Sequence, residues 1–280
     1  MLNNANFLCE IGNEEIPAGY LPSAITSLKN IFSEKLTEMR IDFSEIEVYT
    51  TPRRLSVLIS GLADAQRNET VELKGPSFQA AYDAAGKPTK ALEGFLRGNG
   101  IELNDVSARD TDKGRYVFAM KKLGSEKTEN VIPGILEHCL ANLPFPKRMK
   151  WSDKKITFPR PILYFVLMFN DRVIPFEIEG IKSGNRTRGH FVQHNTMLKI
   201  SKITEYAETL RCNGVILDQN ERREIIGQGL IMSAEAAGGV LNEDEDLLDT
   251  VTYLVENPYI VTCEFDKNFL QIPDIVLITE

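Results

Sequence analysis

The side chains best suited to chemistry lie in a basic, glycine-containing stretch, Lys182-Ser183-Gly184-Asn185-Arg186-Thr187-Arg188-Gly189-His190. Its two glycines allow the backbone to approach a ligand closely. In an extended segment, Arg186, Arg188 and His190 project to the same side. Three donors in a row can follow a phosphate backbone. A solvated hairpin loop that carries charge for solubility explains the same composition slightly better, so both interpretations stay open.

Two further basic segments also suit phosphate. The segment Pro144-Phe145-Pro146-Lys147-Arg148-Met149-Lys150-Trp151 places cations beside aromatic rings, a combination that contacts RNA through phosphate and stacking together. Its Trp151, the only tryptophan, fits a subunit interface or a closed core at least equally well. The segment Thr51-Pro52-Arg53-Arg54 puts two guanidinium groups at the start of a strand, where phosphate and structural carboxylates are equally good partners.

Charge is unevenly distributed along the 280 residues, whose net charge is −8. Residues 146–190 hold ten lysines and arginines against four acids, a net charge of +6. Residues 218–256 hold ten acids against two arginines, a net charge of −8. The first stretch, which includes Arg160, can meet a polyanion and the second repels one. For any single charge, an ordinary solvated surface remains the better explanation.

Motifs for the common catalytic chemistries are missing. There is no phosphate-binding G-x-x-x-x-G-K-[ST] loop, no G-x-G-x-x-G after a strand and no G-x-S-x-G elbow. Glu10, Glu14 and Glu15 suit general acid–base work, but negative charge at a helix start explains the last two better. His190 and His194 are four apart, yet Gly189 argues against a helix there, and the cysteines are scattered (Cys9, Cys139, Cys212, Cys263). We expect no catalytic residue and no metal site.

Periodicity predicts an α+β fold with mixed or antiparallel sheets and packed helices. Strands are expected over 7–11, 46–49, 55–59, 115–121 and 162–169, with a tight hairpin at Asn170-Asp171. The strand at 55–59 should be half-buried, with Arg54, Ser56 and Ser60 on its polar side. Helices are expected over 17–39, 90–97, 131–140 and 203–210, from Asp218 to Gly238-Gly239, and from an Asn242 cap to Asn257-Pro258.

The linker candidate at 123–127 predicts two α+β regions, 1–125 and 126–280. The end of the sequence, from Pro273, reads as a helix that is just beginning, so we expect a truncated piece of a longer polypeptide. No apolar run approaches the length of a membrane span and no signal peptide is recognisable. Scattered, reduced cysteines are typical of a cytoplasmic protein.

Several segments, in this order, resemble the N-terminal region of the β subunit of the bacterial two-subunit glycyl-tRNA synthetase. The resemblance begins at Phe7-Leu8-Cys9-Glu10-Ile11-Gly12-Asn13-Glu14-Glu15-Ile16-Pro17, which is similar to the family's E-I-G-T-E-E-L-P. It continues through 51–55, 86–91, 94–95, 143–147, 160–162, 185–190 and 254–258, and so covers nearly the whole chain. After Arg160-Pro161-Ile162 the family commonly has His-Trp where this sequence has Leu163-Tyr164, so a role of that histidine does not carry over.

The resemblance implies an α2β2 enzyme whose α subunit holds the class II site for glycine, ATP and Mg²⁺. It implies that this chain holds no cofactor, that its partners are the α subunit and tRNA(Gly), and that DNA and membranes are not partners. Part of the fold should be similar to the B3/B4 module of phenylalanyl-tRNA synthetase β subunits. The candidate tRNA contacts are then Arg53, Arg54, Lys147, Arg148, Lys150, Arg160, Arg186, Arg188 and His190, and Trp151 is the candidate interface residue. An editing hydrolase and a purely structural docking region for the α subunit are the alternatives.

Overall fold

The computed structural model describes residues 4–279, which form two compact units. The first unit contains the residues up to 34, residues 43–61, and the chain from 133 onward. The second unit contains residues 35–42 and 62–132 and is therefore an insertion within the first. This division differs from the predicted regions 1–125 and 126–280. The reason is that a strand near the start of the chain pairs with a strand that follows the insertion, a long-range contact that local composition does not encode.

A mixed seven-stranded sheet forms the centre of the first unit, in the order β2-β3-β1-β7-β10-β9, with β8 paired to β7. All neighbouring pairs are antiparallel except β7 and β10. Asn170 and Asp171 join β7 to β8 at positive φ, so the predicted hairpin is confirmed. The strands are β1 (Ala5–Asn13), β2 (Glu45–Thr51), β3 (Arg54–Ser60), β7 (Ile162–Phe169), β8 (Arg172–Val173), β9 (Glu177–Ile178) and β10 (Ile181–Gly184).

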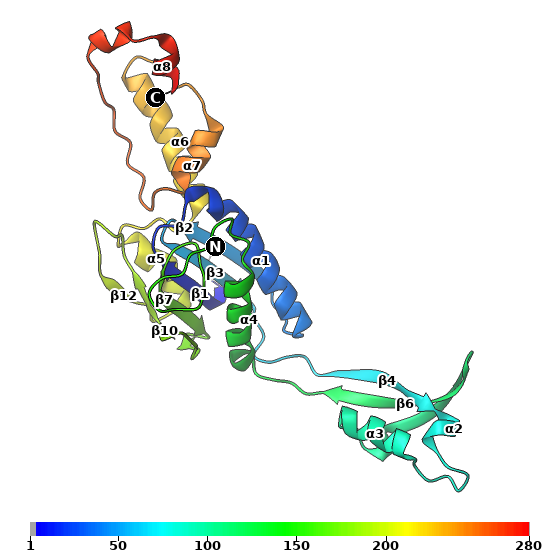
Figure 1. Cartoon of the computed structure of the whole chain (residues 1–280). Helices are drawn as coiled ribbons and strands as arrows, with labels where there is room; N and C mark the ends of the chain where they lie inside the picture. Colours follow the sequence, from blue (N-terminus) through cyan, green and yellow to red (C-terminus); the bar gives the residue numbers. More distant parts are fainter. Residues whose placement is uncertain (1–3, 280) are drawn as a thin grey trace. The chain divides into compact units, whose positions relative to one another are not determined.

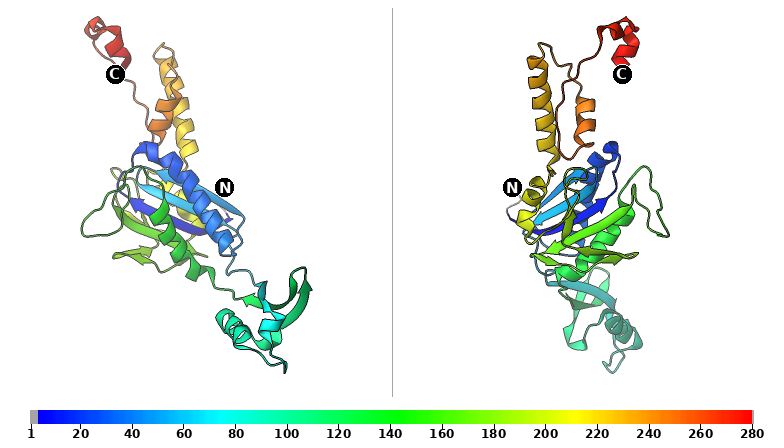
Figure 2. Two further views of the ribbon diagram at one scale, coloured as in Figure 1. Left: turned by 45° about the vertical axis from the view of Figure 1, so that its right-hand side comes forward. Right: turned by 90° about the vertical axis from the view of Figure 1, so that its left-hand side faces the viewer.

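Helices α1 (Leu21–Glu38) and α4 (Thr128–Asn142) lie along one face of this sheet (Figures 1 and 2). Phe7 of β1 meets Phe32 of α1 there, with ring centroids 6.0 Å apart. The opposite face packs against α5 (Tyr206–Arg211) and the residues around it. Because both faces are covered, the continuous apolar run predicted for β7 is confirmed as a central strand.

Alternation on the strands assigns residues to these faces. Leu8 and Leu58, which are directly opposite each other in β1 and β3, belong to the core against α5. Glu10, Arg54, Ser56 and Tyr164 follow the same alternation, so their side chains also face α5. The expectation that β3 is half-buried, with a solvated polar side, is therefore wrong, because Arg54 and Ser56 are buried.

A long arm follows α5 in the first unit. Helix α6 (Gln219–Ala236) begins at Asp218, whose side chain accepts a hydrogen bond from the Asn220 amide, and it ends before Gly238, as predicted. Helix α7 (Glu245–Thr252) is capped by Asp244 rather than by Asn242, and it ends before the predicted Asn257-Pro258 stop. The single aspartate is sufficient to cap the start of α7. Beyond Tyr253 the chain is no longer helical, and Glu256 is buried there. The remaining short elements are η2 (Ala18–Tyr20), β11 (Arg186–Arg188), β12 (Met197–Lys199), η4 (Ile203–Glu205), η5 (Lys267–Gln271) and α8 (Asp274–Thr279).

The second unit is a three-stranded antiparallel sheet in the order β4-β6-β5. Its helices pack on one face of the sheet through a small core of Ala81, Leu92 and Val117. The predicted helix at 90–97 and strand at 115–121 are both present. The elements are β4 (Glu69–Ser77), α2 (Phe78–Ala81), α3 (Lys90–Asn99), η3 (Leu103–Asp105), β5 (Val106–Thr111) and β6 (Gly114–Leu123).

Candidate functional site

A buried polar network lies between the sheet of the first unit and α5. Alternation brings Glu10, Arg54 and Tyr164 together from three neighbouring strands. Thr187 of β11 and Glu256, which follows α7, close the network from the other side. Glu10, Arg54, Thr187 and Glu256 are each at most 4% exposed. Segments that are far apart in the sequence therefore meet at one point through polar side chains.

The Glu10 carboxylate accepts three hydrogen bonds from hydroxyl groups. Tyr164 donates to Oε1 over 2.8 Å, Thr187 donates to Oε1 over 2.8 Å, and Tyr206 donates to Oε2 over 2.9 Å. Because the Tyr206 proton goes to Glu10, Ser56 donates to the Tyr206 oxygen, 2.7 Å away. Gly12 makes room for this arrangement, since a Cβ there would lie 2.2 Å from Cζ of Tyr164.

The Arg54 guanidinium lies between two carboxylates. Its nitrogens are 3.5 Å from Oε1 of Glu10 and 3.1 Å from Oε1 of Glu256. It also donates to the Thr187 hydroxyl and to the Arg188 carbonyl oxygen. The sequence indicates Arg54 as a possible phosphate contact, but its side chain is only 1% exposed, so structural carboxylates occupy it instead.

The electrostatics of the network favour structure over catalysis. Burial raises the pKa of Tyr164 and of Tyr206, and the Glu10 carboxylate raises both further, so the two phenols stay protonated as donors at neutral pH. Burial lowers the pKa of Arg54, but the carboxylates beside it outweigh burial and the net shift is upward. The hydroxyl of Thr187 both donates and accepts. A catalytic nucleophile needs a neighbouring base that is free to take its proton. Here the carboxylates of the network already accept hydrogen bonds from other side chains.

A second buried arginine fixes the arm to the sheet. Arg222 of α6 is 0% exposed and donates to the carbonyl oxygens of Thr50, Ile216, Leu217 and Thr252. Burial lowers its pKa to about 10 despite the opposing influence of Glu256. It therefore remains charged at neutral pH and ties β2, the residues before α6, and the end of α7 into one structure.

Two other predicted contacts have local partners. Arg53 forms ion pairs of 3.0 Å with both Glu14 and Glu15, and its guanidinium lies 3.8 Å above the Phe191 ring. Arg160 donates to the Glu15 carbonyl oxygen and its side chain is exposed. Arg53 is thus largely neutralised, whereas Arg160 keeps its charge at the surface.

The basic stretch at 182–190 forms β10 and β11 rather than a loop. Thr187 points inward, so Arg186 and Arg188 point outward together, as the extended conformation predicts. Arg186 is directly opposite Lys199 of β12. His190 departs from the expected row, because its Nδ1 accepts hydrogen bonds from the backbone amides of Val192 and Gln193.

The segment at 144–151 separates into structural and exposed parts. All five N–H groups of Arg148 are used, by the Thr157 hydroxyl and carbonyl and by the carbonyls of Leu140, Ala141 and Leu143. Arg148 therefore caps the end of α4, and none of its N–H groups remains for the predicted contact with phosphate. Lys147 and Lys150 are exposed and form no ion pair with any described residue, while Trp151 is half-buried.

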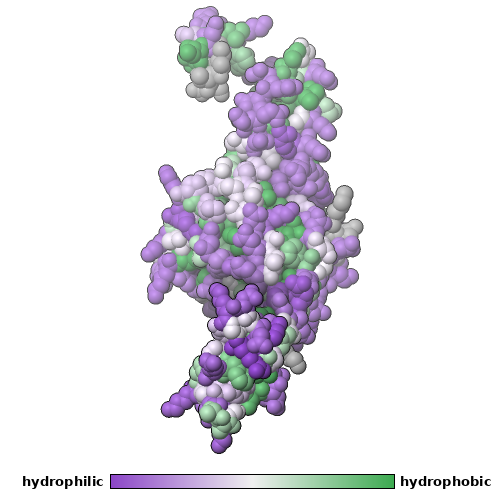
Figure 3. Space-filling view, turned by 90° about the vertical axis from the view of Figure 1, so that its right-hand side faces the viewer, coloured by the Kyte–Doolittle hydropathy of each residue, from purple (hydrophilic) through white to green (hydrophobic). Residues whose placement is uncertain are grey.

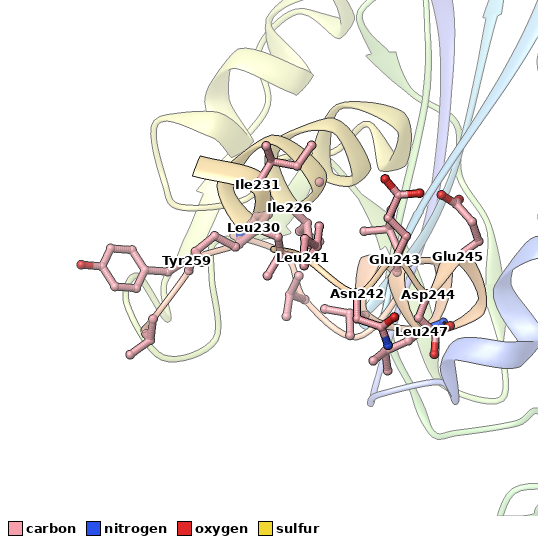
Figure 4. A pocket seen from close by; sticks show the side chains of 17 residues that line it. Ile226, Leu230, Ile231, Leu241, Asn242, Glu243, Asp244, Glu245, Leu247 and Tyr259 are labelled. Carbon is pink, nitrogen blue, oxygen red and sulfur yellow. Dashed lines mark hydrogen bonds between the residues drawn. The ribbon is translucent and has the colours of Figure 1, made fainter. Parts of the chain in front are cut away.

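A cavity of about 510 Å³ lies in the arm, between α6, α7 and residues 258–261. Figure 4 shows Leu230 and Leu241 within it and the carboxylates of Glu243 and Glu245 at its margin. Large apolar side chains also stay exposed along the arm, where Figure 3 shows hydrophobic surface at its upper end. They include Met232, Val240, Leu247, Leu254, Tyr259, Val261 and Phe265. An acidic, apolar groove suits a protein segment and repels a polyanion.

Sequence reasoning missed the residues that complete the buried network. The sequence places Tyr206 only in an expected helix and Glu256 only in the family segment 254–258, because their partners in the network are far away in the chain. The sequence indicates Glu10 only as a possible acid–base group. Over residues 4–279, no cluster of three or more histidine, cysteine or acidic side chains suits a metal ion. None of the described helices is both long and apolar enough to cross a membrane.

Comparison with known proteins gives these features a family. Residues 7–280 match the family described as glycyl-tRNA synthetase beta subunit. A glycine–tRNA ligase beta subunit of Syntrophotalea carbinolica is 40% identical over 99% of this chain, and that of Clostridioides difficile is 39% identical over 97%. That of Syntrophus aciditrophicus is 38% identical over 97%. The chain spans about 40% of the length of these curated relatives. It belongs to the glycyl-tRNA synthetase β-subunit family.

Proposed function

We propose that this chain contributes tRNA binding and subunit assembly to the ATP-dependent attachment of glycine to tRNA(Gly). In this proposal the aminoacylation site, with ATP and Mg²⁺, lies on the α subunit of an α2β2 enzyme of class II in the cytoplasm. The four free cysteines fit a reducing compartment. We also propose that part of the first unit is similar to the B3/B4 module of phenylalanyl-tRNA synthetase β subunits.

The observation that carries the proposal is the arrangement of cations on β11 and β12. Arg186 and Lys199 are directly opposite each other on neighbouring strands, and both are exposed. Like charges in that position destabilise a sheet. Neither side chain forms an ion pair with a described residue, and Arg188 lies on the same side of β11. A polyanion that neutralises these cations removes the repulsion between them, and this favours its binding.

The groove of the arm supports the assembly half of the proposal. Apolar residues such as Leu247 and Leu254 are more than half exposed, and acids surround the cavity. We propose that the α subunit covers this surface and that Trp151 contributes to an interface. The editing alternative has less support, since the hydroxyls of the buried network are engaged with Glu10 and Glu256. A pocket shaped for glycine can exclude every larger amino acid sterically, which reduces the need for editing.

The test of tRNA binding compares matched charge removals in the complete ligase. Arg186→Gln, Arg188→Gln and Lys199→Gln are combined in one variant. Lys29→Gln, Arg172→Gln and Lys267→Gln together form the control, because these three cations are exposed elsewhere in the first unit. The measurement is the dissociation constant for a tRNA(Gly) transcript over a series of salt concentrations.

The β11–β12 variant should weaken binding and reduce the dependence of log K on log salt by about 0.7–0.9 for each phosphate that it no longer neutralises. The control should leave both quantities unchanged. An unaltered salt dependence in the β11–β12 variant would remove the hairpin from the tRNA interface. A parallel pull-down with Leu247→Asp tests assembly, and full retention of the α subunit would contradict the proposed covering of the groove.

A further inference from the structure

Among the described residues of the second unit, the helices cover one face of its sheet, and the other face, here called the uncovered face, gathers aromatic rings and cations. Val117 packs against the helices, so alternation on β6 turns Tyr116 and Phe118 to the opposite face. Lys74 of β4 is directly opposite Phe118, and Arg109 of β5 is directly opposite Tyr116. The uncovered face therefore presents two aromatic rings on the central strand, with a cation on each side.

The distances show that these cations lie over the rings. Nζ of Lys74 is 3.7 Å from the centroid of the Tyr116 ring, and Cζ of Arg109 is 4.5 Å from that of Phe118. The Arg109 side chain is 55% exposed and also pairs with Glu72. Met120, two residues further along the same face, is 47% exposed. The two cations are thus exposed, and the rings beneath them are half-buried.

A cavity of about 290 Å³ adjoins the same strand. Tyr116 lines it, together with Lys113 of the β5–β6 turn, Arg115 at the start of β6 and the polar side chains of Ser77 and Gln79. No acidic residue among those described lines this cavity. Neither Lys113 nor Arg115 forms an ion pair within the described part of the chain. One ring therefore belongs both to the aromatic face and to a positively charged hollow.

We infer that this face binds unpaired nucleotides of RNA, with bases stacked on Tyr116 and Phe118 after the long side chains of Lys74 and Arg109 swing off the ring faces. Phosphates meet Lys74 and Arg109 along the face and Lys113 and Arg115 at the cavity. Aromatic rings on a sheet accept any base, because every base has a π-face, and nearby cations track the backbone. Asp110 and Asp112 on the same hairpin limit the positive field, which favours a few nucleotides over a long duplex.

The inference rests on the proposed function, since the RNA would be unpaired nucleotides of the bound tRNA. It assigns that contact to the second unit, whereas the candidates from the sequence and the β11–β12 cations all belong to the first. The two sites can be tested separately, because each has its own variants and a short single-stranded oligonucleotide offers unpaired bases to the rings.

The experiment measures fluorescence anisotropy of a labelled, unstructured hexaribonucleotide with the complete ligase. The variant Tyr116→Leu with Phe118→Leu keeps apolar volume on β6 but removes both rings. Tyr259→Leu is the control, because it removes an 87% exposed tyrosine from the arm. The double variant should bind at least about fivefold more weakly for each base that no longer stacks. Circular dichroism and thermal unfolding check that it is folded.

A second variant separates charge from stacking. Lys113→Gln with Arg115→Gln should flatten the salt dependence of hexanucleotide binding by about 0.7 for each phosphate that the two cations neutralise. It leaves the rings of the uncovered face in place, so it remains informative if the leucine variant fails to fold. An unchanged salt dependence would overturn the role assigned to the cavity.

Four results would overturn the inference. One is a folded leucine variant that binds the hexanucleotide as the wild type does. Another is an equal loss for a blunt RNA hairpin, which would mean that the face senses charge rather than unpaired bases. The third is a loss of subunit assembly without loss of RNA binding, which would make the face a protein-docking surface. If the wild-type ligase binds tRNA but no hexanucleotide, this inference alone fails, whereas absence of tRNA binding defeats the proposed function itself.

Discussion

Replacing Arg54 with methionine should strongly destabilise the first unit. Methionine fills much of the volume, but it removes the charge that faces Glu10 at 3.5 Å and Glu256 at 3.1 Å. It also withdraws the hydrogen bonds to Thr187 and to the Arg188 carbonyl. Removing one partner of a buried ion pair costs about 3–5 kcal/mol, because the remaining charge is buried without compensation. The destabilisation is a large part of the roughly 5–15 kcal/mol typical of a folded domain.

The pH dependence of this destabilisation distinguishes charge from simple packing. In the Arg54→Met variant the two buried carboxylates lack a cation, so the folded state takes up protons more readily than the unfolded chain. When the folded state binds more protons, stability falls as the pH rises. The difference in unfolding free energy between wild type and variant should therefore be larger at pH 7 than at pH 5. A defect of packing alone would be the same at both values.

Trp151 makes the measurement specific to the first unit. It is the only tryptophan and belongs to that unit, so its fluorescence during denaturation by guanidinium reports the unit's own unfolding. Arg172→Met is the control, because Arg172 is exposed on β8, and it should change stability by less than about 0.5 kcal/mol. Glu256→Gln keeps the shape of the network and supplies a milder variant if Arg54→Met does not fold. A destabilisation below about 1 kcal/mol for a folded Arg54→Met variant, equal at both pH values, would refute the reasoning.

The packing, thiol and capping arguments each give a further prediction. Gly12→Ala should destabilise the first unit by about 1–3 kcal/mol, because the added Cβ displaces Tyr164. In Gly134→Ala in α4 the added Cβ meets no atom within 4 Å, so this variant should stabilise the unit by up to about 1 kcal/mol. Fluorescence of Trp151 during denaturation measures both changes. The two exposed thiols should react with a chromogenic disulfide in the folded state, Cys263 faster than Cys212, because a hydrogen bond to Glu208 raises the pKa of Cys212. The other two should react only after unfolding, since burial raises the pKa of Cys139 to about 12 and that of Cys9 well above its usual value. Asp244→Ala should cost about 1 kcal/mol and speed amide exchange in α7, while Asn242→Ala should leave exchange unchanged, and the reverse order would contradict the assigned cap.

Local patterns predicted the elements better than their assembly. The helix at 90–97, the central strand at 162–169 and the hairpin at Asn170-Asp171 depend on neighbouring residues, and each is present. The insertion of the second unit was not predictable, because it depends on β1 pairing with β7, which lies beyond the whole inserted segment. The polar side of β3 was misjudged for the same reason, since its partners Glu256 and Thr187 lie more than 130 residues away.

The candidate tRNA contacts fall into two groups, according to the hydrogen-bond acceptors that surround each side chain. Arg54 and Arg148 have the composition of a phosphate contact, but the fold supplies carboxylates to one and carbonyl oxygens to the other. Charge counts along the chain cannot distinguish such arginines from Arg186, whose charge stays at the surface. These arginines differ in the number of hydrogen-bond acceptors near the guanidinium group. That number depends on which distant segments the fold brings together.

The buried network and the exposed cations are mechanically connected through β11. Thr187 is held by Arg54 on one side and by Glu10 on the other, over 3.2 and 2.8 Å. Because β11 alternates, fixing Thr187 inward also fixes the directions in which Arg186 and Arg188 leave the strand. Donors that are held in place before a ligand arrives lose less conformational freedom when they bind it. The buried network therefore contributes to function without being catalytic. It holds the surface cations in one geometry.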